Sequence, residues 1–177
     1  MSPFAGPLFA AAGLLLAAGL AKATTPAATR VALRSAGLPS KAWMARALGV
    51  VEIAIAVAAL TVGGTIPAAL VALTYLGFAG FVALLARRTR STAPCGCFGA
   101  SDAPVGTLHV VLDVAIAALA VGAAIRPTDG LAQATSETPW AGVPFFALTA
   151  LLAWATYVAL TLLPELQAAM KPQGAPS

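Results

Sequence analysis

Long apolar stretches alternate with short polar ones five times along the chain. The apolar stretches fall at about residues 4–22, 44–62, 66–86, 105–125 and 142–163. Each is close to the roughly 20 residues of helix that cross the apolar core of a bilayer. Alanine, leucine and valine dominate them, and scattered glycines allow close helix packing. We therefore predict an all-α, polytopic transmembrane helical bundle with a four-helix core and a fifth C-terminal transmembrane helix.

The connections between the predicted spans are short. Residues 62–65, with the sequence VGGT, predict a tight turn that makes spans two and three a hairpin. Residues 27–36 predict a short basic helix on the lipid headgroups, or else an ordinary basic loop. A signal peptide is the alternative for the first span, but no basic residue precedes Lys22 to support it. No long hydrophilic segment interrupts the pattern, so we predict a single integral membrane domain over residues 1–177.

Composition agrees with a membrane protein. Of the 177 residues, 60% are hydrophobic and 9% are charged, and the mean hydropathy is +0.91. A soluble domain carries about 25% charged residues, far more than this chain has. The net charge is +4. In a membrane protein the positions of the basic residues indicate the topology, so we do not interpret this charge as affinity for nucleic acid. We expect the lipid bilayer, and no nucleic acid, as a partner.

The basic residues fall almost entirely on one side of the predicted topology. They are Lys22, Arg30, Arg34, Lys41 and Arg46 in or beside the first loop, Arg87, Arg88 and Arg90 in the third loop, and Lys171 after the last span. Only Arg126 falls on the other side. The positive-inside rule makes the basic side cytoplasmic. We predict a multi-pass protein of the inner (cytoplasmic) membrane with its N-terminus outside, its C-terminus in the cytoplasm and its cysteine loop at the cytoplasmic face.

Both cysteines of the chain, Cys95 and Cys97, lie in the loop RRTRSTAPCGCFGASDAPVG between spans three and four. Residues two positions apart can reach disulfide distance, with Gly96 supplying backbone freedom. The small ring would be strained, and strained disulfides are more oxidising and easily reduced. Neighbouring arginines and the start of the next helix favour the thiolate. We predict a reactive dithiol.

Two other interpretations of the cysteines remain open. Buried cysteine is common as a small apolar residue, so both thiols would then only pack. Alternatively, the two thiolates and His109 would hold zinc or copper. A C-x-C pair with one histidine lacks the four-ligand pattern of structural zinc sites, and the predicted site therefore contains no metal.

Three ionisable residues lie inside predicted spans. Glu52 is near the middle of span two, and His109 and Asp113 are four residues apart on one face of span four. Ionisable groups are costly in a bilayer and by default mark function. A carboxylate beside a histidine fixes its tautomer and raises its basicity, which suits proton transfer to and from a cysteine. We predict all three as catalytic residues with the dithiol; the alternative is a polar tie between helices.

Three segments carry a resemblance to a known family. They are AAGLAKA with Lys22, ARALGVVEIAIAVAAL with Glu52, and PCGCFGASDAPVGTLHVVLD with Cys95, Cys97, Phe98, Gly99, His109 and Asp113. Over about residues 5–125 the chain resembles the DoxX-like membrane proteins and, within them, the MauE type of methylamine utilisation protein. The third segment is the most specific of the three.

The resemblance implies that electrons are exchanged between thiols and disulfides across the cytoplasmic membrane. MauE-type proteins are associated with maturation of the disulfide-rich small subunit of methylamine dehydrogenase, alongside a thioredoxin-like partner. This carries over Cys95 and Cys97 as the redox pair. In outline the family is similar to the DsbB and vitamin K epoxide reductase proteins, which implies a quinone as a cofactor. Those proteins use further cysteines, and this chain has no second pair.

Two functions of different class follow. In the first, the protein is a membrane thiol–disulfide oxidoreductase: Cys95 exchanges with a thioredoxin-like protein, Cys97 resolves the mixed disulfide, and an exported protein gains its disulfides. In the second, it is a non-enzymatic assembly factor or a metal-binding membrane protein. Redox-dependent exchange would favour the first function, and metal that co-purifies and is lost with the cysteines would favour the second.

Overall fold

The computed structural model describes residues 2–89, 106–137 and 147–159, and these residues are almost entirely helical. The helices are α1 (Ala5–Thr24), α2 (Ala27–Ser35), α3 (Ala42–Thr61), α4 (Thr65–Thr89), α5 (Thr107–Ile125), α6 (Leu131–Glu137) and an unlabelled helix, Ala147–Ala159. The described residues form no β-strand, only one isolated bridge. The predicted all-α class is confirmed.

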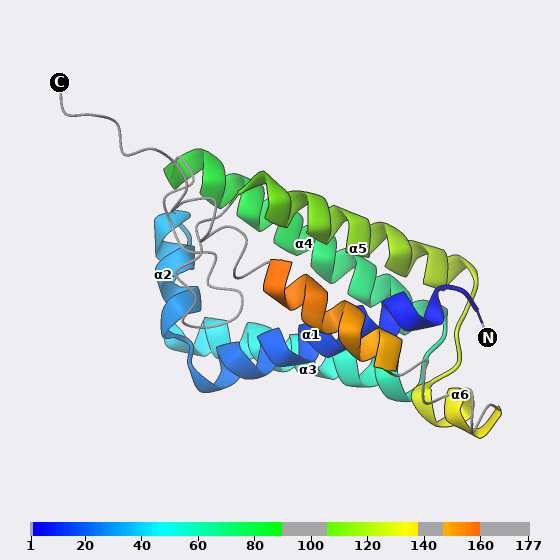
Figure 1. Ribbon diagram of the computed structural model, residues 1–177. Coiled ribbons are helices and arrows are strands. Elements are labelled where there is room, and N and C mark those ends of the chain that lie inside the picture. Colours follow the sequence, from blue (N-terminus) through cyan, green and yellow to red (C-terminus); the bar gives the residue numbers. More distant parts are fainter. Residues whose placement is uncertain (1, 90–105, 138–146, 160–177) are drawn as a thin grey trace.

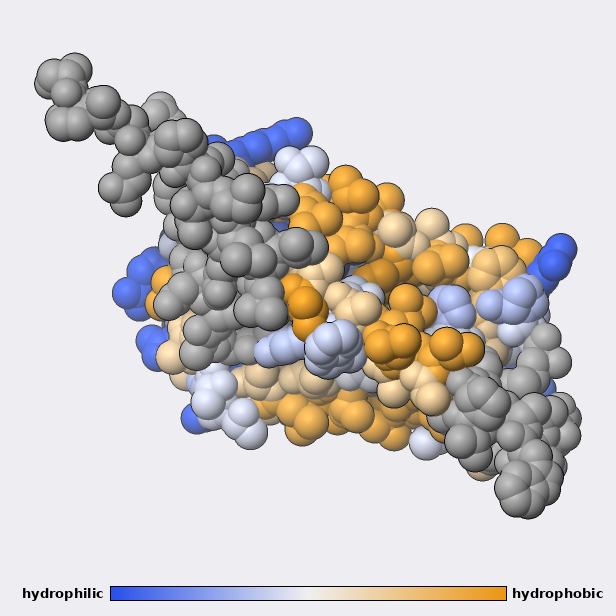
Figure 2. Space-filling view, viewed as in Figure 1, coloured by the Kyte–Doolittle hydropathy of each residue, from blue (hydrophilic) through white to orange (hydrophobic). Residues whose placement is uncertain are grey.

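Four helices, α1, α3, α4 and α5, are long and apolar enough to cross a membrane, and they correspond to the first four predicted spans. On the face shown in Figure 2, hydrophobic residues dominate the middle of the molecule and the most hydrophilic residues lie toward its two ends. Helix Ala147–Ala159 lies within the predicted fifth span but is shorter than these four. The remaining residues of that span, 142–146 and 160–163, lie outside the described residues.

The four long helices pack as two antiparallel pairs. Helix α1 lies along α3, and α4 lies along α5, whereas α3 and α4 contact each other much less (Figure 1). Tyr75 of α4 ties the pairs together, because its buried hydroxyl donates a 2.9 Å hydrogen bond to the Ala11 carbonyl of α1. The core between the pairs consists largely of alanine, together with Leu8, Leu15, Val71 and Tyr75. Small side chains of this kind let helix backbones approach one another.

Helices α1 and α3 come closest at a pair of glycines. A Cβ atom on Gly19 would lie 2.8 Å from the Gly49 carbonyl oxygen, and one on Gly49 would lie 2.6 Å from the Gly19 carbonyl oxygen. Neither contact is tolerable for a methyl group. Glycine at both positions therefore sets the separation of the two helices.

The predicted turn between spans two and three is confirmed. Gly63 and Gly64 have φ angles of 67° and 85°, in the left-handed region that favours glycine. The turn is held by the segment after α5, because the Gly64 N–H donates a 2.8 Å hydrogen bond to the buried Thr128 carbonyl. Gly63 and Asp129 form an isolated antiparallel bridge beside it. At this end of the bundle, backbone contacts therefore join the turn between α3 and α4 to the segment that follows α5.

Helix α2 lies across the opposite end of the bundle, which we call the α2 end (Figure 1). It confirms the short helix predicted at residues 27–36. Arg88 of α4 donates a 2.7 Å hydrogen bond to the Ala36 carbonyl at its C-terminus. The α2 end carries Arg30, Arg34, Arg46, Arg87 and Arg88 on its helices and Lys41 directly before α3, whereas Arg126 follows α5 at the other end. Figure 1 also shows that α4 ends and α5 begins at the α2 end.

Candidate functional site

Four ionisable side chains are buried within the spanning helices. They are Lys22 of α1, Glu52 of α3, and His109 and Asp113 of α5, and each residue is at most 6% exposed. Three of them are the predicted intramembrane site residues. Burying a charge in an apolar interior is costly unless it is paired, so each of these side chains needs a polar partner.

Glu52 forms an ion pair with Lys22. The Lys22 Nζ lies 2.9 Å from Glu52 Oε2, and both side chains are almost completely buried. The direction of the helices explains the pairing. Side chains on an α-helix lean toward its N-terminus, and because α1 and α3 are antiparallel, the two side chains lean toward each other across the Gly19–Gly49 crossing. The other Glu52 oxygen, Oε1, is buried and has no hydrogen-bond partner among the described residues.

Lys22 is the functional candidate that sequence reasoning missed. Its place in the sequence suggests a residue beside the first loop that sets topology, but it lies in the last turn of α1 and is 3% exposed. Its ammonium also lies 5.0 Å from the centre of the Phe78 ring on α4, within cation–π range. The signal was present in the sequence, since Gly19-x-x-Lys22 and Gly49-x-x-Glu52 repeat one spacing on the two helices.

His109 and Asp113 share one buried face of α5, as their spacing predicted. Asp113 interacts electrostatically with Lys22, which brings α5 into the same network as α1 and α3. Lys22 is therefore ion-paired with Glu52 and lies within electrostatic range of Asp113 on a third helix. Both predicted carboxylates, Glu52 and Asp113, thus interact with a residue that was not predicted as part of the site.

The predicted dithiol, Cys95 and Cys97, lies outside the described residues. The described chain enters this connection at Thr89 of α4 and leaves it at Gly106, and both of these residues lie at the α2 end. His109 follows in the first turn of α5. The connection is therefore anchored directly before the buried face that carries His109 and Asp113. Among the described residues no group of three metal-ligating side chains occurs.

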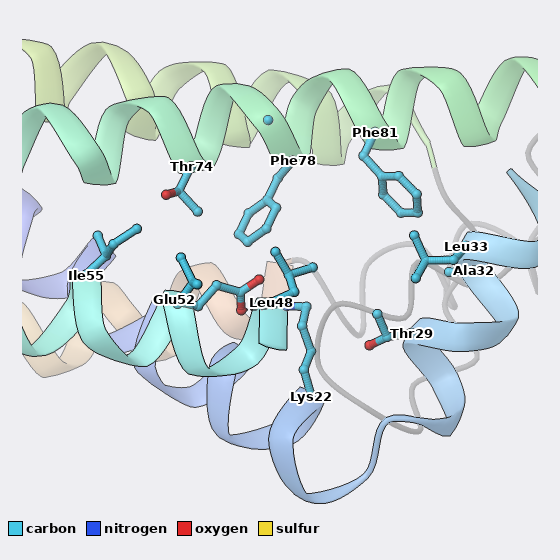
Figure 3. A pocket seen from close by; sticks show the side chains of 12 residues that line it. Lys22, Thr29, Ala32, Leu33, Leu48, Glu52, Ile55, Thr74, Phe78 and Phe81 are labelled. Atoms are coloured by element: carbon cyan, nitrogen blue, oxygen red, sulfur yellow. Dashed lines mark hydrogen bonds and ion pairs between the residues drawn. The ribbon is translucent and has the colours of Figure 1, made fainter. Parts of the chain in front are cut away.

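A cavity of about 320 Å³ lies between α3 and α4 and is bounded by α2 at the α2 end (Figure 3). Most of its wall is apolar, including Leu48 and Phe81. The buried ion pair forms its polar wall, and Figure 3 shows the Glu52 carboxylate between the Phe78 ring and the Lys22 side chain. The sparse contact between α3 and α4 leaves the room for this cavity.

Comparison with known proteins gives one match. The family model described as methylamine utilisation protein MauE matches residues 3–126, which span all four long helices and the cysteine connection. No curated protein and no solved structure matches significantly. The predicted likeness to MauE-type proteins is confirmed, whereas the DoxX-like grouping remains a prediction. Since the match covers well over half of the chain, this membrane protein belongs to the MauE family of methylamine utilisation proteins.

Proposed function

We propose that the protein is a membrane thiol–disulfide oxidoreductase whose Cys95–Cys97 dithiol exchanges electrons with a thioredoxin-like partner. In methylamine utilisation, this exchange would support disulfide formation in an exported protein. One observation carries the proposal: the two cysteines of the chain stand one residue apart in a connection anchored at the α2 end, directly before the buried His109 and Asp113.

The exchange is balanced between the two proteins. The Cys95 thiolate attacks a disulfide of the partner, which forms a mixed disulfide and releases one partner thiolate. The Cys97 thiolate then attacks the Cys95 sulfur, which closes the Cys95–Cys97 disulfide and releases the second partner thiolate. Two electrons pass from the dithiol to the partner, and the reverse sequence passes them back.

The buried face of α5 supplies the proton transfers that this chemistry needs. Each attack requires a thiolate, and each leaving thiolate takes up a proton. His109 is the only histidine of the chain, and histidine is the side chain that most readily exchanges a proton near neutral pH. Asp113, one turn further along α5, would stabilise the protonated imidazole.

The location follows the charge distribution. Six basic residues meet at the α2 end, and cytoplasmic segments of membrane proteins are enriched in lysine and arginine. We therefore propose that the protein lies in the cytoplasmic membrane with the α2 end, and the start of the cysteine connection, on the cytoplasmic side. A cytoplasmic thioredoxin-like protein would then be the partner that reaches the dithiol.

Labelling with a membrane-impermeant maleimide tests both proposals. In inverted vesicles Cys95 and Cys97 should react only after mild reduction, whereas in intact cells they should not react. Reaction in intact cells after reduction would reverse the proposed orientation and keep the redox function. Free thiols that react equally with and without reductant would contradict the redox function and favour the metal-binding or assembly alternative.

A second experiment tests the partner. Replacing Cys97 with serine removes the resolving thiol, so Cys95 should accumulate as a mixed disulfide with a thioredoxin-fold protein. The matched control is Cys95→Ser, which should trap nothing if Cys95 is the attacking thiol. Equal trapping by both variants would contradict the assigned order of attack.

A further inference from the structure

We propose that the cavity between α3 and α4 binds a lipid-soluble quinol or quinone, with its ring against Phe78 and its oxygens toward Lys22 and Glu52. The inference deepens the proposed function and rests on it for its biological role, although binding itself is testable without the dithiol. A quinone that receives two electrons and two protons becomes a quinol. These are the electrons and protons that Cys95 and Cys97 release when they close their disulfide.

The polar wall of the cavity offers both kinds of hydrogen-bonding group. Lys22 carries an ammonium that donates, and Glu52 Oε1 is a buried acceptor with no partner among the described residues. A buried acceptor left unsatisfied is destabilising. A quinol hydroxyl would donate to Oε1, and a quinone carbonyl would accept from the Lys22 ammonium. A ligand headgroup whose oxygens can both donate and accept hydrogen bonds, as the quinol and quinone rings do between them, therefore matches the polar groups of this wall.

The charge of the wall favours an uncharged head. Lys22 and Glu52 form a close ion pair, so an anionic head would face the Glu52 carboxylate and a cationic head would compete with the Lys22 ammonium. Bringing a like charge beside either buried group is strongly unfavourable. A fatty acid or an alkylamine is therefore a poorer ligand than a neutral molecule of the same length.

The aromatic residues on α4 suit a flat ring. Phe78 and Phe81 both line the cavity, one turn apart. The Phe78 ring is held in place by an edge-to-face contact with Tyr75, at 5.7 Å between ring centres. Aromatic pairs in offset or edge-to-face contact gain about 0.5–1.5 kcal/mol beyond their burial. A ring therefore gains more from this wall than an alkyl chain does.

The rim of the cavity opens toward the lipid. Leu48 and Val51 of α3 line it and are 40% and 54% exposed, and Gly77 on α4 is exposed opposite them. All three lie within spanning helices, where the exposed face meets lipid chains. A prenyl or alkyl tail can therefore remain in the bilayer while the head occupies the cavity, and no opening to water is needed.

Photolabelling of the full-length protein in lipid nanodiscs tests the site. The probe is an azido-benzoquinone with a decyl tail, and labelled peptides are identified by mass spectrometry. We expect label on α3 and α4 around Leu48–Ile55 and Thr74–Phe81. Excess unlabelled decylubiquinone should suppress this label, whereas decanoate and decylamine should not. Label spread over all four spanning helices in proportion to their exposure, or equal suppression by the charged competitors, would overturn the proposal.

Two glycines of α4 provide a matched pair of variants. Gly77 lines the cavity, whereas Gly80 does not, and a Cβ atom at either position meets nothing within 4 Å. Gly77→Leu would fill the rim, and we expect labelling of the cavity to fall about tenfold, the equivalent of about 1.4 kcal/mol in affinity. Gly80→Leu should leave labelling unchanged. Equal labelling of the two variants would contradict the assignment of the cavity.

Failure of this inference can be separated from failure of the proposed function. The labelling is repeated on the Cys95→Ser/Cys97→Ser protein, which has no thiol. Retained labelling supports a quinone site in the cavity that does not depend on either thiol. Labelling that disappears in this variant would overturn the assignment to the ion-pair cavity, while the maleimide experiment reports separately on the dithiol.

Discussion

Loss of one partner of the Lys22–Glu52 pair should destabilise the protein more than loss of both. At a separation of 2.9 Å the attraction between two unit charges is about 6 kcal/mol at an effective dielectric constant of about 20. Desolvation of the two charges opposes most of this attraction. Lys22→Met leaves the Glu52 carboxylate buried without its cation. We expect the free energy of unfolding to fall by about 3–5 kcal/mol, the range for breaking a buried pair.

The double variant Lys22→Met/Glu52→Leu removes both charges and keeps similar volumes. We expect its free energy of unfolding to lie within about 1 kcal/mol of the original, because hydrophobic replacements of buried pairs are often neutral. Glu52→Leu alone should cost less than Lys22→Met alone. Lys22 then still has Asp113 as an electrostatic partner, whereas Glu52 has no second cation among the described residues.

The assay is equilibrium unfolding in mixed micelles of dodecylmaltoside and dodecyl sulfate, followed by far-ultraviolet circular dichroism. Arg46→Met is the matched control, because Arg46 is an exposed cation on α3 and its loss should change stability by less than about 0.5 kcal/mol. Two results would refute the reasoning. They are a cost for Lys22→Met no larger than that of the control, or a double variant that loses the sum of the two single costs.

Three further predictions concern other parts of the molecule. Gly49→Leu should lower the free energy of unfolding by about 3 kcal/mol or more, because the side chain would meet the backbone of α1, whereas Gly80→Leu should not; thermal unfolding compares them. Tyr75→Phe should cost about 0.5–1.5 kcal/mol in the same measurement, because one buried hydrogen bond between α4 and α1 is lost while the Ala11 carbonyl keeps its bond within the helix. His109→Gln should slow disulfide exchange at neutral pH about tenfold or more without changing stability comparably, and stopped-flow mixing with a reduced thioredoxin would measure it. An unchanged exchange rate would remove His109 from the chemistry.

The sequence predicted the spanning helices well because apolar length is a local property. The first predicted span, residues 4–22, corresponds to Ala5–Thr24, and the third, residues 66–86, corresponds to Thr65–Thr89. The turn between α3 and α4 was equally local, since Gly63-Gly64 permits the positive φ angles it uses. Each of these features depends on neighbours in the chain, so one sequence is enough to locate it.

The interior was predicted less well because it depends on contacts between distant residues. Glu52 was predicted as a catalytic residue or a polar tie to span four, whereas its ion-pair partner Lys22 lies 30 positions earlier, at the end of span one. A lysine in that place normally extends to the membrane surface, so its burial could not be inferred from position alone. The hydrogen bond between Gly64 and Thr128 was missed for the same reason. The assignment of roles to Cys95 and Cys97 stays a prediction.

The buried ion pair also bears on how the chain enters the membrane during synthesis. A charged residue at the centre of a span raises the free energy of insertion by about 2.5–3.5 kcal/mol. Glu52 therefore makes the insertion of α3 into the membrane less favourable. Lys22 leaves the ribosome first and lies in the last turn of α1, near enough to the boundary to stay hydrated while it waits. When α3 arrives antiparallel to α1, the lysine can turn inward and neutralise the carboxylate as α3 leaves the translocon. α1 would thus act as an internal chaperone for the insertion of α3.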